Sequence, residues 1–161
     1  MQFLPYSPDD SDRIESMLDN HIDFAPEVYS SAAKNEDTDY FRAAYADSCC
    51  CGINYVLKSD HDDLIAGFME AKKKNTQNRV ACWYITALFV ANNDKAEENA
   101  LAMVTAFQSS LCDSNEICIN VNPKAKDIAR FWSTHGFAPN PDRSIFSNAD
   151  EQTLVAYWKR F

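Results

Sequence analysis

The segment from Glu116 to Phe137, EICINVNPKAKDIARFWSTHGF, constrains the fold of this chain more than any other stretch. Residues 117–121 form a short apolar run that predicts a buried strand. Asn122-Pro123 ends that strand, and apolar side chains then recur at helical spacing as far as Gly136, a residue type that commonly terminates helices. Phe137 returns to the core, so the segment predicts one strand–helix unit.

A second unit of the same kind lies directly upstream. Arg79–Ala91 is the longest apolar stretch and predicts a strand at the centre of a sheet, and Asn92–Leu111 carries a helical pattern. Two consecutive strand–helix units place the chain among α/β folds, with a mixed sheet and flanking helices.

The remaining sequence shows no repeat or linker, so residues 1–161 are expected to form a single domain. A first helix is expected to start at residues 7–10 and to use His21 or Ile22 on its apolar face. Further strands are expected at 2–6, 51–57, 64–71 and 154–161, further helices at 23–35 and from residue 36, and polar turns or loops at 58–63, 72–78 and 140–143.

Acidic side chains are concentrated in the first part of the chain. Of the 24 Asp and Glu residues, 15 lie within residues 1–70, which contain four Lys and Arg. This balance disfavours a nucleic-acid partner and would attract cationic ligands, although solubility alone is the other interpretation. No apolar run approaches the ~20 residues of a membrane span, so no membrane partner is expected.

The six cysteines do not show the paired short spacing of a zinc site. Three are adjacent, at Cys49–Cys51, and the others are Cys82, Cys112 and Cys118. We therefore expect no metal site and no disulfides. The first residues lack the basic and apolar regions of a secretory signal, so a cytoplasmic protein with reduced thiols is expected.

Five segments taken together resemble the GNAT superfamily (GCN5-related N-acetyltransferases) over essentially the full length. The likeness implies a mostly antiparallel seven-stranded sheet whose fourth and fifth strands splay apart. It rests on FLPYSPDDSDRIESML at the start, Ile65–Met69 for the third strand, Leu88–Val90 for the fourth, Phe131–Phe137 for the motif F-Y-x-x-x-G-F, and the final strand.

The resemblance implies an acetyl-CoA-dependent N-acetyltransferase acting on a small amine, by direct transfer in a ternary complex. The pantetheine arm of acetyl-CoA would pair with the backbone of Leu88, Phe89 and Val90. The pyrophosphate would lie on the following loop and helix start, because free N–H groups and the helix dipole bind phosphate there. In this loop the cofactor-binding candidates are Lys95, Ala96, Asn99 and Ala100.

Two positions depart from the family pattern. Glu98 stands at the central glycine of the phosphate loop, where its charge opposes the diphosphate; the alternative is that Asp94-x-x-Glu97 caps the helix and leaves no place for phosphate. Trp132 replaces the tyrosine that often protonates the leaving thiolate, and indole has no useful acidity. Its other interpretation is a core residue.

Three side chains are the catalytic candidates. Glu70 is the best-placed carboxylate for deprotonating an amine, or else a solvent-facing strand residue. Tyr84 could act as a general acid or line the acceptor site, or else pack in the core. His135 could replace the missing acid through water, or else bond the last carbonyls of its helix.

The acceptor and the alternative function follow from the same features. Acids in the first helices, including Asp23 and Glu27, would suit a cationic acceptor such as a polyamine or an aminoglycoside. Homodimers are common in the family, so a homodimer is one expectation. If Glu98 and Trp132 have abolished catalysis, the chain would instead be a GNAT-fold binding or dimerisation module.

Overall fold

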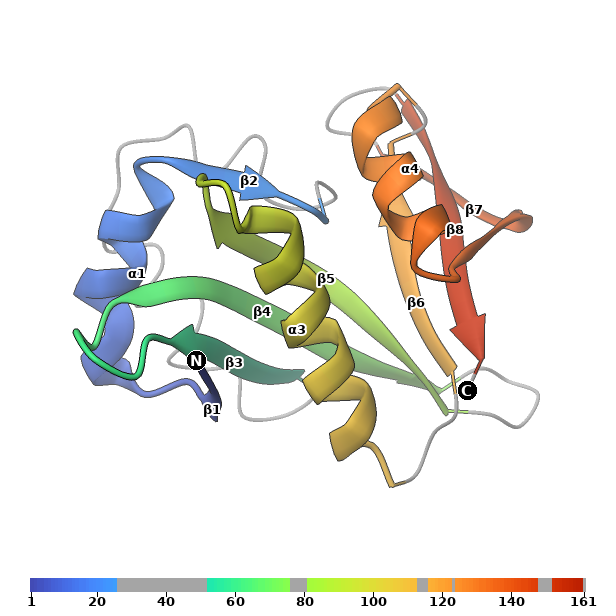
Figure 1. Cartoon of the computed structure of the whole chain (residues 1–161). Coiled ribbons are helices and arrows are strands. Elements are labelled where there is room, and N and C mark those ends of the chain that lie inside the picture. The colour runs from blue at the N-terminus through green and yellow to red at the C-terminus, as the bar shows by residue number, and fades with distance from the viewer. Residues whose placement is uncertain (26–51, 76–80, 113–115, 123, 148–151, 161) are drawn as a thin grey trace.

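An eight-stranded sheet flanked by helices forms the centre of the molecule (Figure 1). The computed structural model describes residues 1–25, 52–75, 81–112, 116–122, 124–147 and 152–160. The strands are β1 Gln2–Pro5, β2 His21–Asp23, β3 Gly52–Lys58, β4 Ile65–Asn75, β5 Ala81–Ala91, β6 Glu116–Val121, β7 Ala138–Ser147 and β8 Gln152–Arg160. The helices are the 3-10 turn η1 Pro8–Asp10, α1 Ser11–Leu18, α3 Ala96–Ser110 and α4 Lys126–Thr134.

The sheet has the order β1-β3-β4-β5-β6-β8-β7, with β2 paired to β5 off this path. Among the described strands β5 and β6 form the one parallel pair. That pairing runs only from Trp83 opposite Ile117 to Ile85 opposite Ile119. Beyond Ile85 the strands separate, which is the splay that the sequence resemblance implied.

Helices cover both faces of the sheet. On one face, Ile14 and Met17 of α1 pack against Phe68 and Phe89. On the other, α3 and α4 bury a larger apolar cluster that includes Met103, Phe107, Phe131 and Trp132. Gly67 of β4 lies under α3, where an added Cβ would come within 2.6 Å of Met103 Sδ, so the glycine of the third-strand motif permits close packing of this helix.

A β-bulge marks the start of the splay. Glu70 pairs with Ala87 and Ala71 pairs with Ile85, so Thr86 is the extra residue on β5. Bulges bend a strand and increase its twist. Because Ile85 is also the last β5 residue paired with β6, the bend occurs where β5 leaves its parallel neighbour.

The expected elements are largely present, with corrections at their ends. The first helix stops at Leu18, and His21 and Ile22 belong to β2 instead, which raises the expected seven strands to eight. The expected loop 72–78 is wrong at its start, because β4 runs to Asn75. The expected turn 140–143 lies within β7, where pairing with β8 is interrupted between Asn140 and Ile145.

The expected second helix at 23–35 is wrong at its start, because Asp23 belongs to β2 and residues 24–25 are not helical. The rest of it and all of the third helix, from residue 36, lie outside the described residues. In the part of the chain that the structure describes, no helix is both long and apolar enough to cross a membrane.

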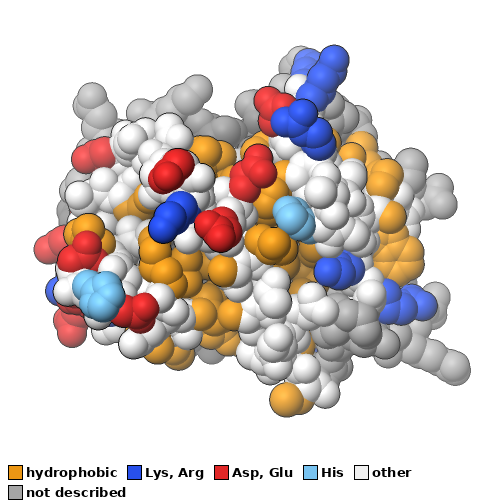
Figure 2. All heavy atoms as spheres, in the orientation of Figure 1, with side chains coloured by type: hydrophobic (Ala, Val, Ile, Leu, Met, Phe, Trp, Pro, Cys, Tyr) orange, Lys and Arg blue, Asp and Glu red, His pale blue; other side chains and the backbone are white. Residues whose placement is uncertain are grey.

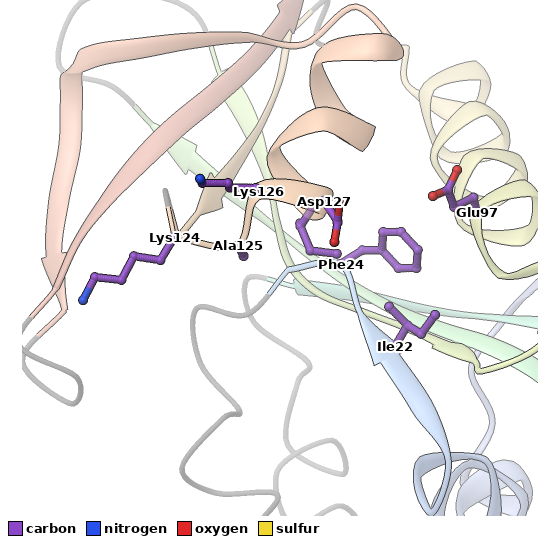
Figure 3. A pocket seen from close by; sticks show the side chains of 8 residues that line it. Ile22, Phe24, Glu97, Lys124, Ala125, Lys126 and Asp127 are labelled. Carbon is purple, nitrogen blue, oxygen red and sulfur yellow. The ribbon is translucent and has the colours of Figure 1, made fainter.

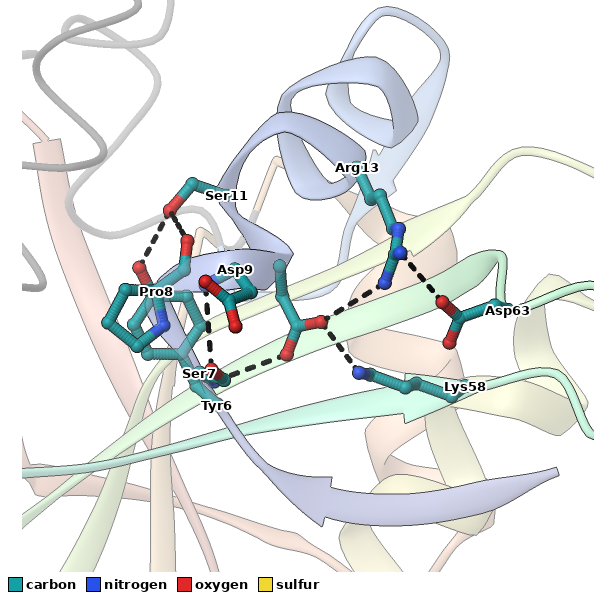
Figure 4. A network of polar contacts seen from close by, with 9 residues as sticks. Tyr6, Ser7, Pro8, Asp9, Ser11, Arg13, Lys58 and Asp63 are labelled. Atoms are coloured by element: carbon teal, nitrogen blue, oxygen red, sulfur yellow. Dashed lines mark hydrogen bonds and ion pairs between the residues drawn. The ribbon is translucent and has the colours of Figure 1, made fainter.

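A buried carboxylate ties the first helical turn to the sheet (Figure 4). Asp10 is 1% exposed and accepts a hydrogen bond from the Ser7 backbone N–H at 3.1 Å. Its Oδ1 lies 2.6 Å from Lys58 Nζ of β3 and 3.6 Å from Arg13 Nη1. Opposite charges at such a partly dry position attract more strongly than surface ion pairs do.

Replacing Asp10 by asparagine is expected to lower the free energy of unfolding by about 1.5–3 kcal/mol, the range for hydrogen bonds to charged groups. Lys58 would keep its charge without its closest carboxylate. Urea denaturation at pH 7 measures the change, with Asp9→Asn as the matched control because Asp9 is exposed. Equal stability of the two variants would contradict the role assigned to Asp10.

Candidate functional site

β2 occupies the edge of β5 that β6 leaves (Figure 1). His21, Ile22 and Asp23 pair antiparallel with Ala91, Val90 and Phe89. The ladder extends past both ends of the strand, because Phe24 N–H donates to Leu88 O at 2.9 Å and Asn92 N–H donates to Asn20 O at 3.0 Å. The backbone of Leu88–Val90, where the sequence predicted a pantetheine arm, therefore already faces a strand of this chain.

Trp132 holds the end of β2 from the side of α4. Its indole N–H donates to the backbone O of Phe24 at 2.9 Å, and the side chain is fully buried. The Phe24 ring lies 4.7 Å from the Phe131 ring, centroid to centroid. The core interpretation of Trp132 is thus confirmed, and its indole also satisfies a backbone group of the segment that fills the splay.

A pocket of about 530 Å³ opens beside β2, between the starts of α3 and α4 (Figure 3). Ile22 and Phe24 supply an apolar wall. Its remaining lining residues are Glu97 of α3 and Lys124, Ala125, Lys126, Asp127 and Ile128 at the start of α4.

Neither helix start at this pocket is capped by a side chain. Lys95 is the N-cap of α3 and Ala125 that of α4, and neither makes a capping hydrogen bond. The expected Asp94–Glu97 capping box is therefore wrong. Instead, the Asn93 side-chain oxygen accepts a hydrogen bond from the N–H of Lys95 at 2.9 Å, and Lys95 is the residue immediately before α3. The first N–H of each helix is already bonded, because Ala96 N–H donates to Asn93 O and Lys126 N–H donates to Lys124 O. The following N–H groups of each first turn have no partner within the helix, and these donors border the pocket.

Lys124 and Lys126 were missed by the sequence reasoning. Lys126 is the first residue of α4, where a cation is unfavourable to the helix dipole. A basic residue in that position was the available signal for an anion site. Figure 2 shows Lys and Arg side chains gathered over this end of α4, and both lysines are exposed.

The opposite face of the splay carries acidic groups. Residues paired across antiparallel strands share a face, so Asp23, paired with Phe89, and Glu70, paired with Ala87, lie on the α1 side. Glu70 is 3% exposed, so its solvent-facing alternative is wrong. Its Oε2 accepts from Thr86 Oγ1 at 2.6 Å, and its Oε1 lies 3.0 Å from Lys72 Nζ.

Asp23 is the described group in the splay whose ionisation is most perturbed. Burial raises the pKa of the Asp23 carboxyl to about 6, while a hydrogen bond from the Ala25 N–H and the nearby His21 oppose the rise. That hydrogen bond reaches Asp23 Oδ1 at 2.8 Å. A carboxyl with such a pKa can exchange a proton near neutral pH.

The other predicted site residues fall into two groups. Tyr84 is half-buried on the same face as Glu70, because it pairs with Lys72, whereas His135 ends α4 on the other side of the sheet. The structure therefore brings Glu70 and Tyr84 onto one face and leaves His135 apart. Lys95 is exposed at the α3 start, while Ala96, Asn99 and Ala100 are buried beneath it.

The fold is that of known acetyltransferases. An aminoglycoside 6'-acetyltransferase type Ii has 13% identity and a TM-score of 0.69 over 99% of this chain and 97% of its own. A spermidine N-acetyltransferase SpeG chimera from Vibrio cholerae and hSSAT has 12% and 0.69 over 99% and 96%. The NatB acetyltransferase complex bound to CoA and MES has 12% and 0.72 over 100% and 99%.

No profile of a protein family matches the sequence, and no curated protein sequence matches it either. The structural likeness nevertheless extends over nearly the whole chain. This chain therefore has the GNAT fold, as the five sequence segments predicted.

Proposed function

We propose that this protein is an acetyl-CoA-dependent N-acetyltransferase whose acceptor is a small cationic amine. One observation carries the proposal: the splay separates two sites of opposite character. On the α3/α4 side, uncapped helix starts and two lysines border a pocket suited to an anion. On the α1 side, Asp23 and Glu70 present carboxylates suited to a cation.

The phosphate end of acetyl-CoA fits the described residues better than its pantetheine end does. Lys95, Lys124 and Lys126 would meet the phosphates at the helix starts, although the acids Glu97, Glu98 and Asp127 oppose them. The edge of Leu88–Val90 is paired with β2, so the pantetheine arm fits there only if β2 moves away. Acetyl-CoA, when bound, supplies the acetyl group and the thiolate leaving group.

The chain's own residues would prepare the acceptor. Asp23 would accept the proton of the ammonium, because its raised pKa matches neutral conditions. Asp23 belongs to β2, so this role requires that β2 keeps Asp23 beside the acceptor when it leaves the edge of β5. Glu70 is engaged by Thr86 and Lys72, so its role would be to attract and orient the cation, with Tyr84 lining the same face. His135, on the other side of the sheet, remains a proposed proton donor through water.

Two of the structural neighbours are consistent with such an acceptor. Their names identify an aminoglycoside acetyltransferase and a spermidine acetyltransferase, both acting on amines with several positive charges. The acidic first part of this chain has the charge to attract the same class.

Calorimetric titration with acetyl-CoA at low salt tests the proposal. The wild type is expected to bind, Lys124→Ala plus Lys126→Ala to weaken binding by about tenfold or more, and Glu98→Gly to tighten it by about tenfold, since 1.4 kcal/mol corresponds to tenfold. Lys73→Ala, which removes an exposed lysine of β4 outside the pocket, is the charge-matched control. A screen of cationic and neutral amines then identifies the acceptor.

The pairing of β2 with β5 favours a second candidate function. Because β2 fills the edge that would hold the pantetheine arm, the chain can instead be a GNAT-fold binding or dimerisation module. Absence of heat with millimolar acetyl-CoA, for both the wild type and Glu98→Gly, would favour this module over the enzyme. Size-exclusion chromatography with light scattering would then determine whether a homodimer forms.

A further inference from the structure

We propose that Cys82, Cys118 and Glu116 form a binding site for one zinc ion between β5 and β6. The ligand atoms of these three residues lie within 4.8 Å of one another. All three are buried, at 1%, 0% and 3% exposure. Spacing in the sequence could not reveal this site, because the two cysteines belong to different strands, 36 residues apart.

The three side chains converge from one face of two parallel strands. Cys118 of β6 pairs with Tyr84 of β5. Cys82 lies two residues before Tyr84 on β5, and Glu116 lies two residues before Cys118 on β6. Residues two apart in a strand share a face, so all three side chains lie on the same face of the sheet. The Cys82 thiol donates to Cys118 Sγ at 2.9 Å. Cys118 Sγ also lies 3.9 Å from Glu116 Oε1.

This placement suits a shared metal ion better than a disulfide. Strands about 4.8 Å apart and a two-residue offset of about 6.6 Å put the two Cα atoms about 8 Å apart. Cα atoms more than about 7 Å apart cannot be bridged by a disulfide without backbone movement. Two thiolates about 2.3 Å from a tetrahedral zinc lie about 3.8 Å apart, which small side-chain rotations from 2.9 Å can reach.

The donor set and its charge favour zinc. Zinc accepts thiolate and carboxylate ligands together, whereas copper(I) prefers sulfur alone. Two thiolates and one carboxylate exceed the charge of the ion by one, and the Arg160 guanidinium, 3.8 Å from Glu116 Oε2, offsets that excess. A fourth ligand position would remain for water.

A bound ion would affect the end of the splay at which β5 and β6 are still paired. The ion would connect β5 to β6 beside their short parallel pairing, which runs from Trp83 to Ile85 on β5. It would thereby stabilise the end from which the two strands diverge. Binding requires both thiols to lose their protons, so affinity should fall as the pH is lowered.

Cobalt(II) titration of the full-length, reduced and metal-free protein tests the site, because cobalt takes the place of zinc and absorbs visibly. One equivalent should produce thiolate-to-cobalt charge-transfer bands that zinc abolishes. Cys82→Ser and Cys118→Ser should each remove them, whereas Cys112→Ser, an exposed cysteine outside the cluster, should keep them. Glu116→Gln should retain the bands with affinity lowered at least tenfold.

Circular dichroism of each metal-free variant separates lost binding from lost folding, and Cys82→Ala and Cys118→Ala replace any serine variant that unfolds. One equivalent of zinc should also raise the melting temperature of the wild type but not of the Cys118 variants. The proposal is overturned if the wild type shows no thiolate bands, or if the bands persist in the Cys82 and Cys118 variants, which would place the metal on other cysteines. Spontaneous loss of two mass units, indicating a Cys82–Cys118 disulfide, would overturn it as well.

Discussion

Replacing Asp23 by asparagine is expected to stabilise the protein at pH 7 by up to about 3 kcal/mol and to leave its stability unchanged below about pH 4. The physical reason is the burial of this carboxyl in the splay, which raises its pKa to about 6. One pKa unit corresponds to about 1.36 kcal/mol, and the unfolded value lies near 3.9. Asparagine keeps an oxygen that can accept from the Ala25 N–H, without the charge.

The direction follows from proton binding in the two states. Between about pH 4 and pH 6 the folded protein holds a proton on Asp23 that the unfolded chain has already lost. Stability is therefore fully present below pH 4 and falls as the pH rises through about 6. The variant has no such proton, so the difference between variant and wild type should open across that window.

Urea denaturation at several values between about pH 4 and pH 7.5 measures the effect. Asp94→Asn, which removes an exposed carboxylate before α3, is the matched control and should follow the wild type at every pH. A stability difference that did not change with pH would mean that Asp23 is ionised alike in both states, contrary to the burial effect.

The same variant separates stability from activity. If Asp23 takes up the proton of the acceptor amine, Asp23→Asn should lower kcat by about 10²–10⁴-fold, the usual contribution of a general base. A variant that is more stable but less active would indicate that the buried carboxylate lowers the stability of the fold and is needed for catalysis. Undiminished turnover by Asp23→Asn would return the role of base to Glu70.

The sheet and its splay could be predicted from sequence because local patterns determine them. The apolar run 81–91 is rich in aromatic and β-branched residues, which favours a buried strand, and the unit ending at Gly136 carries a helical periodicity. Gly136 has a φ of +85°, a conformation that glycine adopts without strain, so the end of α4 was encoded in a single residue. The arrangement of these elements in the fold could then be predicted, because five motifs that are weak singly occur together in the order typical of one fold.

The contents of the splay could not be predicted in the same way. His21 and Ile22 fit the apolar face of the first helix, and only the free edge of β5, which β6 leaves, turns them into a strand. The capping box at Asp94 failed because the Asn93 side chain bonds the Lys95 N–H and shifts the helix start. Both outcomes depend on tertiary contacts or on the competition between neighbouring polar side chains, which periodicity does not express.

Replacing Trp132 by alanine is expected to lower the free energy of unfolding by about 3–5 kcal/mol, the range for removing a large buried aromatic. The ring is fully buried and contacts Phe131 and Phe137, with centroids 5.1 and 4.8 Å away. Phenylalanine at this position keeps most of the volume but removes the N–H that reaches Phe24 O, so Trp132→Phe should lose about 1–3 kcal/mol.

Loss of the indole N–H and loss of aromatic volume should affect ligand binding differently if β2 competes with acetyl-CoA for the edge of β5. Trp132→Phe weakens the attachment of β2, so the state with an open edge becomes more populated and acetyl-CoA should bind up to about tenfold more tightly. Phe137→Leu is the control, because it thins the same aromatic cluster without touching the bond to Phe24. It should lose stability and gain no affinity. Calorimetry on both variants decides between the alternatives: a gain confined to Trp132→Phe identifies β2 as the competitor, and equal affinities would show that acetyl-CoA binds without displacing it.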